Sequence, residues 1–119
     1  MMAVRVLIAG GGTGGHLFPG IAIAEELKRR DQGTAILFVG SPYGIETRAV
    51  PKAGFDLALL TISGLRRTGL VRRLLSLARM PLALVQALWL VRRFRPDAAL
   101  SVGGYAAGPA VLAARLSGV

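Results

Sequence analysis

The chain has 119 residues, of which 15 are lysine or arginine, 6 are aspartate or glutamate, one is histidine and none is cysteine, so its formal net charge is +9. This length limits the chain to a single domain, and a hydrophobic content of 53% excludes a wholly disordered protein. The lack of cysteine excludes a disulfide scaffold, a thiolate metal site and a cysteine nucleophile, and the few acids and the lone histidine predict neither a metal site nor a cofactor.

Short apolar runs alternate with longer amphipathic ones along the chain. The apolar runs predict strands at Val4–Ala9, Thr34–Val39, Leu57–Ile62 and Asp97–Val102. The amphipathic runs predict helices at Pro19–Arg30, Gly44–Ala53, Leu70–Phe94 and Gly108–Leu116, the third kinked or restarted at Pro81. This alternation predicts an α/β fold, a Rossmann-like parallel sheet with helices on both faces, and right-handed crossovers give the strand order 3-2-1-4.

A glycine-rich turn, Gly10–Gly15, joins the first predicted strand to the first predicted helix. Glycines let a ligand approach the backbone, and the N-terminus of the following helix suits a phosphate. The spacing also matches a dinucleotide fingerprint, but the acid expected at the end of the second strand is absent from Val39–Ser41. No Gly-Lys-Ser/Thr follows the turn, which excludes a P-loop. The turn therefore predicts a phosphate-bearing ligand, with a purely structural turn as the alternative.

His16, the only histidine, follows these glycines directly. Imidazole titrates near neutral pH, so it could act as a general base or donate a hydrogen bond to a phosphate. A capping or packing role is the alternative.

A second glycine-rich segment, Gly103–Pro109, follows the fourth predicted strand. In the predicted topology the first and fourth strands are neighbours, and ligands bind at the carboxyl ends of strands at such a switch point. The two glycine segments are therefore expected to converge on one crevice. Glu46 follows the second strand and either belongs to a solvated helix face or lines that crevice.

The segment between Asp56 and Asp97 contains eight arginines and no acid. Its longest apolar stretch, Leu74–Val91, is interrupted by Arg79, Pro81 and Gln86, which argues against a transmembrane helix. Helical periodicity predicts one broad apolar face formed by Leu70, Leu74, Leu77, Leu84, Val85, Leu88 and Trp89. Part of this apolar face must cover the sheet. The rest, with the arginines and Trp89, favours docking on anionic lipid, and nucleic acid is the weaker alternative because no recognised nucleic-acid module is present.

Several ordered motifs resemble the MurG family of bacterial N-acetylglucosaminyltransferases, which belongs to glycosyltransferase family 28. The run Gly11–Gly20 (GGTGGHLFPG) resembles the start of that family. Later segments match in the same order, at Val50–Gly54, Ile62–Arg66, Arg95–Asp97, Gly103–Tyr105 and Gly108–Pro109. The resemblance covers essentially the whole chain.

The resemblance implies that residues 1–119 form the incomplete N-terminal, acceptor-binding domain of a GT-B glycosyltransferase, without the C-terminal donor domain. The family transfers GlcNAc from UDP-GlcNAc to lipid I with inversion, which makes lipid II for peptidoglycan, and works peripherally at the cytoplasmic face of the bacterial membrane. Carried over by motif, His16 is the catalytic base or a diphosphate contact, and UDP-GlcNAc would meet Thr13, Gly14 and Gly15. The acceptor side would be lined by Gly11, Gly12, Gly103, Gly104 and Tyr105. Membrane docking is assigned to Arg66, Arg72, Arg73, Leu74, Leu75, Arg79 and Trp89.

The expected partners are UDP-GlcNAc, lipid I, an anionic membrane surface and a chain that supplies the C-terminal half; nucleic acid is not among them. Without that half the chain is expected to be inactive. The alternative from another class is a stand-alone membrane-binding or scaffold module with no catalytic role.

Overall fold

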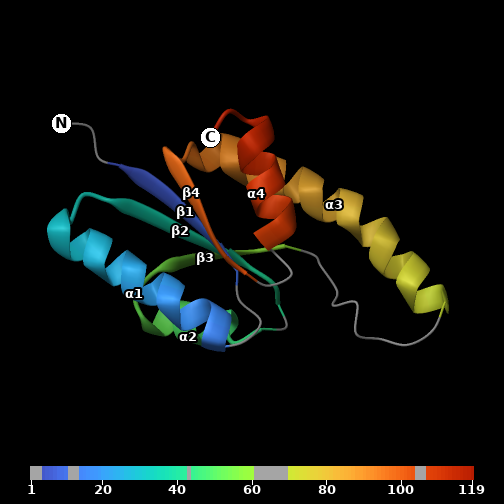
Figure 1. Cartoon of the computed structure of the whole chain (residues 1–119), viewed down its shortest axis with the longest axis horizontal. Coiled ribbons are helices and arrows are strands. Elements are labelled where there is room, and N and C mark those ends of the chain that lie inside the picture. The colour runs from blue at the N-terminus through green and yellow to red at the C-terminus, as the bar shows by residue number, and fades with distance from the viewer. Residues whose placement is uncertain (1–3, 11–13, 43, 61–69, 104–106) are drawn as a thin grey trace.

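The computed structural model describes residues 4–10, 14–42, 44–60, 70–103 and 107–119, and for residues 14–16 and 70–80 it describes the backbone alone. Strands and helices alternate along the chain (Figure 1). The elements are β1 (Arg5–Gly10), α1 (Gly14–Arg30), β2 (Ala35–Gly40), α2 (Glu46–Lys52), β3 (Asp56–Leu59), α3 (Leu70–Phe94), β4 (Ala98–Gly103) and α4 (Ala107–Leu116).

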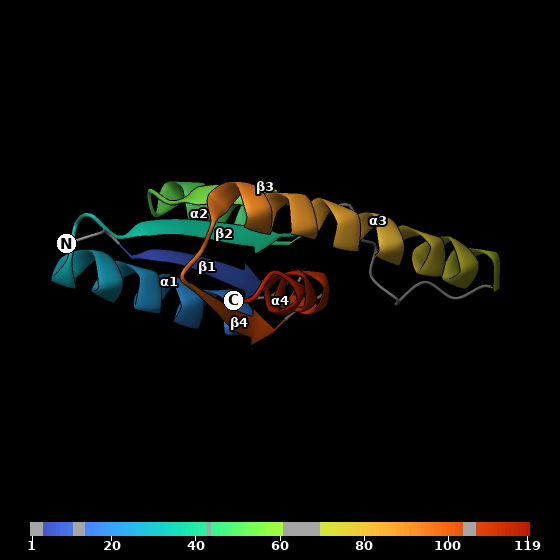
Figure 2. The ribbon, with the colours of Figure 1, turned by 90° about the horizontal axis from the view of Figure 1, so that it is seen from above.

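The four strands form one parallel sheet in the order β3-β2-β1-β4, as predicted. β1 lies in the centre, where Val6 pairs with Ile36 of β2 on one side and with Ala98 of β4 on the other. Helices cover both faces (Figure 2). A parallel sheet covered in this way needs apolar side chains on both faces, which explains why the strands read as continuous apolar runs.

Two core clusters lie on opposite faces of the sheet. Because side chains alternate along a strand, Val6 and Ile8 of β1 face one way, and Leu7 and Ala9 face the other. The first cluster lies beneath α1 and α2 and contains Val6, Ile8, Leu17, Ile21, Ala24, Ile36, Phe38 and Val50. The second lies beneath α3 and α4 and contains Leu7, Ala9, Val39, Leu60, Ala87, Val91, Ala107, Ala110, Ala113 and Ala114.

Helix α1 starts at Gly14, five residues before the predicted start, so Pro19 lies within the helix. Proline is favoured at the first position of a helix, and that preference led to the wrong boundary. Leu17 is completely buried in the first core cluster. The packing of this side chain outweighs the backbone hydrogen bond that Pro19 cannot donate.

Two further boundaries differ from the prediction by two residues or more, and the other differences are of one residue. α2 is shorter than expected because Gly44 belongs to a turn before the helix, in which its carbonyl oxygen accepts hydrogen bonds from Thr47 N and Thr47 Oγ1. β3 ends at Leu59 rather than at Ile62. Leu60 N still donates to Gly40 O at 2.8 Å, and Ile62 itself lies outside the described residues.

Helix α3 runs through Pro81 as one element of 25 residues, so the predicted restart at that residue is wrong. Its C-terminal half packs against α4, which crosses it, and its N-terminal half projects past the sheet (Figure 1). The contact with α4 uses short side chains, an alanine seam formed by Ala87 and Val91 of α3 and by Ala107, Ala110, Ala113 and Ala114 of α4. None of the described helices is long and apolar enough to cross a membrane.

Arg5 ties the start of β1 to the end of α3. Its Nε atom donates to the carbonyl oxygen of Phe94 at 2.6 Å, and its guanidinium carbon lies 4.4 Å from the centre of the Phe94 ring. The backbone N–H of Arg5 donates to Asp97 Oδ2 at 2.8 Å. These contacts orient α3 relative to the sheet.

Candidate functional site

The carboxyl ends of β1 and β4 approach each other closely at Gly10 and Gly103. The two residues are paired, and the register of the two strands shifts between Ala9 and Gly10. Both have positive φ angles, +148° and +92°. A Cβ on Gly10 would overlap the carbonyl oxygen of Gly103 and lie 2.5 Å from Val102 Cγ2, so no other residue fits here without displacing β4. The strand ends that lead into the two glycine-rich segments are therefore neighbours.

Helices α1 and α4 begin just beyond these strand ends, α1 at Gly14 and α4 at Ala107. Gly20 lets α1 lie close to the sheet, since a Cβ there would come within 3.3 Å of both Ile8 Cγ2 and Val102 Cγ1. The first turn of each helix has backbone N–H groups without a partner within the helix, and together with the helix dipole they favour an anion. The edge at β1 and β4 thus carries positive potential without lysine or arginine.

The residues predicted to bind the donor and acceptor are only partly within the described structure. Gly14, Gly15 and His16 form the first turn of α1, so His16 belongs to the helix. Gly103 ends β4. The convergence of the two loops stays a prediction, because their other members lie outside the described residues: Gly11, Gly12, Thr13, Gly104 and Tyr105.

Glu46 is a buried acid at the same edge of the sheet, and its interpretation as part of a solvated face is wrong. Only 1% of its surface is exposed. Its Oε1 atom accepts hydrogen bonds from Ser41 N at 2.9 Å and from Ser41 Oγ at 3.1 Å. Its side chain fills the space above Gly40 and Gly44, where a Cβ on either glycine would collide with it. The signal in the sequence was the pair of glycines that flank this short connection.

The described part of the predicted membrane-docking segment exposes two large apolar side chains, those of Val85 and Trp89. Trp89 is 58% exposed and Val85 62% exposed, and the guanidinium carbon of Arg93 lies 5.2 Å from the centre of the Trp89 ring. Side chains of α3 and of the edge strand β3 enclose a hollow of about 380 Å³, the α3–β3 hollow, lined by Ala58, Leu59, Val85, Gln86, Trp89 and Leu90. Arg72, Arg73, Leu74, Leu75 and Arg79 lie on the first half of α3, and Arg66 lies outside the described residues.

The large apolar side chains of α3 are therefore divided between two faces. Sequence periodicity placed Leu84, Val85, Leu88 and Trp89 on one broad face, whereas the structure packs Leu84 and Leu88 against the second core cluster and exposes Val85 and Trp89. The alanine seam, which the sequence analysis missed, explains the difference. Small residues repeating every four positions are the signal that could have revealed a close helix contact.

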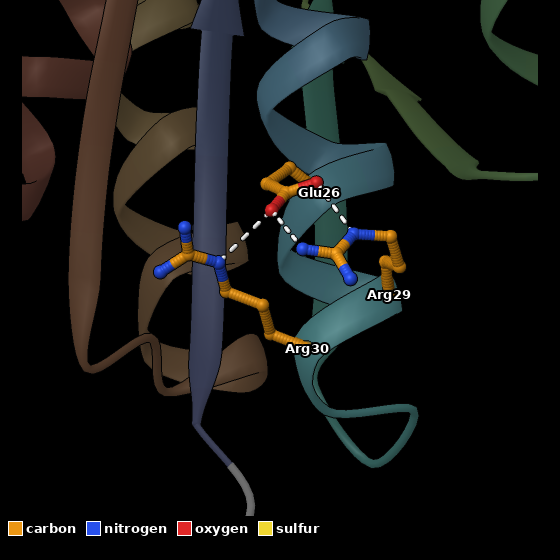
Figure 3. Close-up of polar contacts among 3 residues, drawn as sticks. All are labelled: Glu26, Arg29 and Arg30. Carbon is orange, nitrogen blue, oxygen red and sulfur yellow. Dashed lines mark hydrogen bonds and ion pairs between the residues drawn. The ribbon is translucent and has the colours of Figure 1, made fainter.

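The ion pairs in the described part of the chain lie far from the strand ends. Glu26, near the end of α1, bonds Arg29 Nε at 2.8 Å, Arg29 Nη2 at 2.6 Å and Arg30 Nε at 3.0 Å (Figure 3). These hydrogen bonds, chiefly those from Arg29, lower the pKa of Glu26 from 4.5 to about 2. Within the described residues, no three histidine, aspartate or glutamate side chains are placed to hold a metal ion.

Comparisons with known proteins agree with this geometry. The model of the glycosyltransferase family 28 N-terminal domain matches residues 6–119. The UDP-N-acetylglucosamine–N-acetylmuramyl-(pentapeptide) pyrophosphoryl-undecaprenol N-acetylglucosamine transferase of Syntrophus aciditrophicus is 54% identical over 99% of this chain and 33% of its own length. The protein of the same name from Anaeromyxobacter sp. is 50% identical over 95% of this chain and 30% of its own length.

A solved structure, that of MurG from Acinetobacter baumannii, matches with a TM-score of 0.83 and 34% identity. The match covers 98% of this chain and 33% of the MurG chain. It confirms the predicted fold class, part of the N-terminal domain of a GT-B glycosyltransferase. The chain spans about a third of the length of the curated relatives it matches.

Proposed function

The chain belongs to glycosyltransferase family 28, and we propose that it is the acceptor-binding N-terminal part of an inverting enzyme that transfers GlcNAc from UDP-GlcNAc to lipid I. The observation that carries this proposal is the pairing of Gly10 with Gly103 at the switch point of the sheet. Helices α1 and α4 begin just beyond these strand ends, on opposite faces of the sheet, and a diphosphate suits the unpaired N–H groups of their first turns. The names of the two relatives supply the identity of the sugar and of the lipid.

His16 is the proposed catalytic base. Its backbone lies in the first turn of α1, at the carboxyl edge of the sheet. A helix N-terminus disfavours a positive charge, and a neutral imidazole is the form that takes a proton in this proposal. In the proposed reaction the hydroxyl oxygen of the acceptor sugar bonds to the anomeric carbon of GlcNAc, the bond from that carbon to UDP breaks, and His16 takes the hydroxyl proton. Thr13, Gly14 and Gly15 bind the donor in this proposal.

The acceptor lipid is anchored in a membrane, so the protein must work at a membrane surface, in the proposed function the cytoplasmic face of the bacterial cell membrane. Exposed Trp89 and Val85, with Arg93 beside Trp89, give α3 the composition of an interfacial helix. The same observation favours the second candidate function, a stand-alone membrane-binding module. The two candidates differ in whether His16 matters.

The decisive experiment is a transfer assay with labelled UDP-GlcNAc and a water-soluble lipid I analogue. The purified chain is assayed alone, and then mixed with the separately expressed C-terminal half of a MurG relative. We expect product only in the mixture. His16→Ala should reduce the rate of the mixture at least a hundredfold, the range typical of a lost general base, whereas Arg92→Ala, an exposed change on α3, should leave it unchanged.

Each alternative result has a clear meaning. Product from the chain alone would refute the proposed need for a C-terminal half. A mixture whose activity survives His16→Ala would refute the role of His16 as the base. No product from either sample, with folded protein that binds anionic vesicles, would favour the membrane-binding module.

A further inference from the structure

Glu46 combines burial with a carboxylate in a way that core packing does not require. It is the only acidic residue buried in the described part of the chain. Burying a carboxylate is costly unless hydrogen bonds replace its water. Here Ser41 supplies two of them, from N and from Oγ, both to Oε1. A buried apolar residue would fill the same space without that cost, so the carboxylate has a task other than filling space.

The contacts of Glu46 span the connection between β2 and α2. Ser41 directly follows the last residue of β2, and Gly44 lies two residues before Glu46. The side chain of Glu46 lies so close above Gly44 that a Cβ there would overlap Oε2, and one on Gly40 would lie 2.5 Å from Cγ. Thr47 also donates two hydrogen bonds to the carbonyl oxygen of Gly44, from N and from Oγ1. One side chain thus fixes both ends of the connection.

This connection lies beside the candidate site. β2 is the hydrogen-bonded neighbour of β1, with Val39 paired to Ala9, so Gly40 and Gly10 end adjacent strands at the same edge. The glycine-rich segment of the proposed site continues from Gly10. A shift of Ser41 would therefore alter the surface next to the loop that is proposed to hold the diphosphate.

From these contacts we propose that Glu46 is a positioning residue for the substrate crevice: its buried carboxylate holds Ser41 by hydrogen bonds and packs against Gly44, so that these two residues form a fixed wall beside the end of β1 at Gly10. It touches neither substrate nor reacting atoms. Because it is 1% exposed, it can set the position of this wall without presenting its own charge to a diphosphate. The proposal rests on the proposed function, because the wall matters only if the crevice binds substrate.

Two measurements on the purified chain test the proposal. Amide hydrogen exchange measures whether the Ser41 N–H group stays hydrogen-bonded to Glu46. Titration with UDP-GlcNAc and with the water-soluble lipid I analogue measures whether the affinity of the crevice for either probe changes. Glu46→Ala should speed exchange at Ser41 at least tenfold and weaken binding of at least one probe tenfold or more. Glu46→Gln, which keeps an acceptor oxygen for Ser41, should restore binding to within about threefold of wild type. Glu25→Ala, an exposed acid on α1, is the matched control and should change neither reading.

The outcomes separate the possible failures. If Glu46→Ala does not fold, the comparison of Glu46→Gln with wild type still tests the proposal. A folded Glu46→Gln chain that binds both probes tenfold more weakly than wild type would show that Glu46 does not act by positioning Ser41 alone. Unchanged exchange at Ser41 in a folded Glu46→Ala chain would also overturn the proposal. If wild type binds neither probe, the proposed function fails, and the exchange result alone then supports or refutes the fixing of Ser41 by Glu46.

Discussion

The carbonyl oxygen of Gly103 occupies the place where a side chain on Gly10 would lie. The two residues end neighbouring parallel strands, and their contact brings the two glycine-rich segments to one point of the sheet. The close approach is thus a property of the backbone, and both positions depend on the absence of a Cβ.

Gly10→Ala should destabilise the chain by about 2 kcal/mol or more, because a Cβ would collide with β4 and alanine is strained at a φ of +148°. Urea unfolding followed by circular dichroism measures the change. Gly108→Ala is the matched control, since that glycine lies in α4 with open space around it, and its stability should change by less than about 1 kcal/mol. Equal effects of the two variants would contradict the close approach of β1 and β4.

Arg5→Ala should cost about 1–2 kcal/mol of unfolding free energy, because it removes the hydrogen bond to Phe94 O and the contact with the Phe94 ring. Arg5→Lys should recover only part of this loss, since lysine has no planar guanidinium to stack on the ring. Thermal unfolding of these variants is compared with that of Arg92→Ala, a change at an exposed arginine in the last turn of α3, so that the contribution of the Arg5 contacts can be separated from a general loss of charge. A chain unaffected by Arg5→Ala would show that α3 is held by its apolar contacts alone.

The carboxylate of Glu26 should titrate near pH 2, below its ordinary value of 4.5, because Arg29 and Arg30 bond the ionised form. The folded-state pKa is lowered, so the contribution of this group to stability is present above about pH 4.5 and is lost as the pH falls through about 2. NMR titration of the side-chain carboxyl carbon measures the midpoint. Salt at 1 M should raise the pKa toward 4.5, because the group is exposed and the ion pairs are screened. A midpoint near 4.5 at low salt would contradict the ion pairs of Figure 3.

Trp89 is the only tryptophan in the chain, so its fluorescence reports directly on the exposed face of α3. Vesicles that contain anionic lipid should shift its emission to shorter wavelength, whereas neutral vesicles should have a weaker effect. Val85→Ser should weaken vesicle binding roughly fivefold, the equivalent of about 1 kcal/mol of lost apolar burial.

The matched control for this surface is Val111→Ser, which makes the same change at an exposed valine of α4. It should bind vesicles as wild type does. If duplex DNA shifted the Trp89 emission more than anionic vesicles did, the nucleic-acid interpretation would replace the membrane one.

Most of the fold was predictable because it depends on local patterns. The apolar runs predicted the strands, and their alternation with helices, joined by right-handed crossovers, predicted the strand order. The start of α1 was missed because the tertiary burial of Leu17 outweighs the preference of Pro19 for a helix start. The burial of Glu46 was also missed, since it depends on a contact between Ser41 and the first turn of α2 that no periodicity reveals. The glycine-rich runs that begin at Gly10 and Gly103 were recognisable from sequence, and the close approach of the two strand ends explains why Gly10 carries no side chain.

The alanine seam between α3 and α4 separates the face of α3 that packs in the core from the face that is exposed to solvent. Because short side chains on one side of α3 make the contact with α4, exchanging Val85 or Trp89 on the other side leaves the packing of the core intact. This outward part of α3 should therefore accept substitutions readily, while the seam itself should tolerate little change. The exposed side chains of α3 can therefore be substituted to change its surface properties without redesigning the core of the domain.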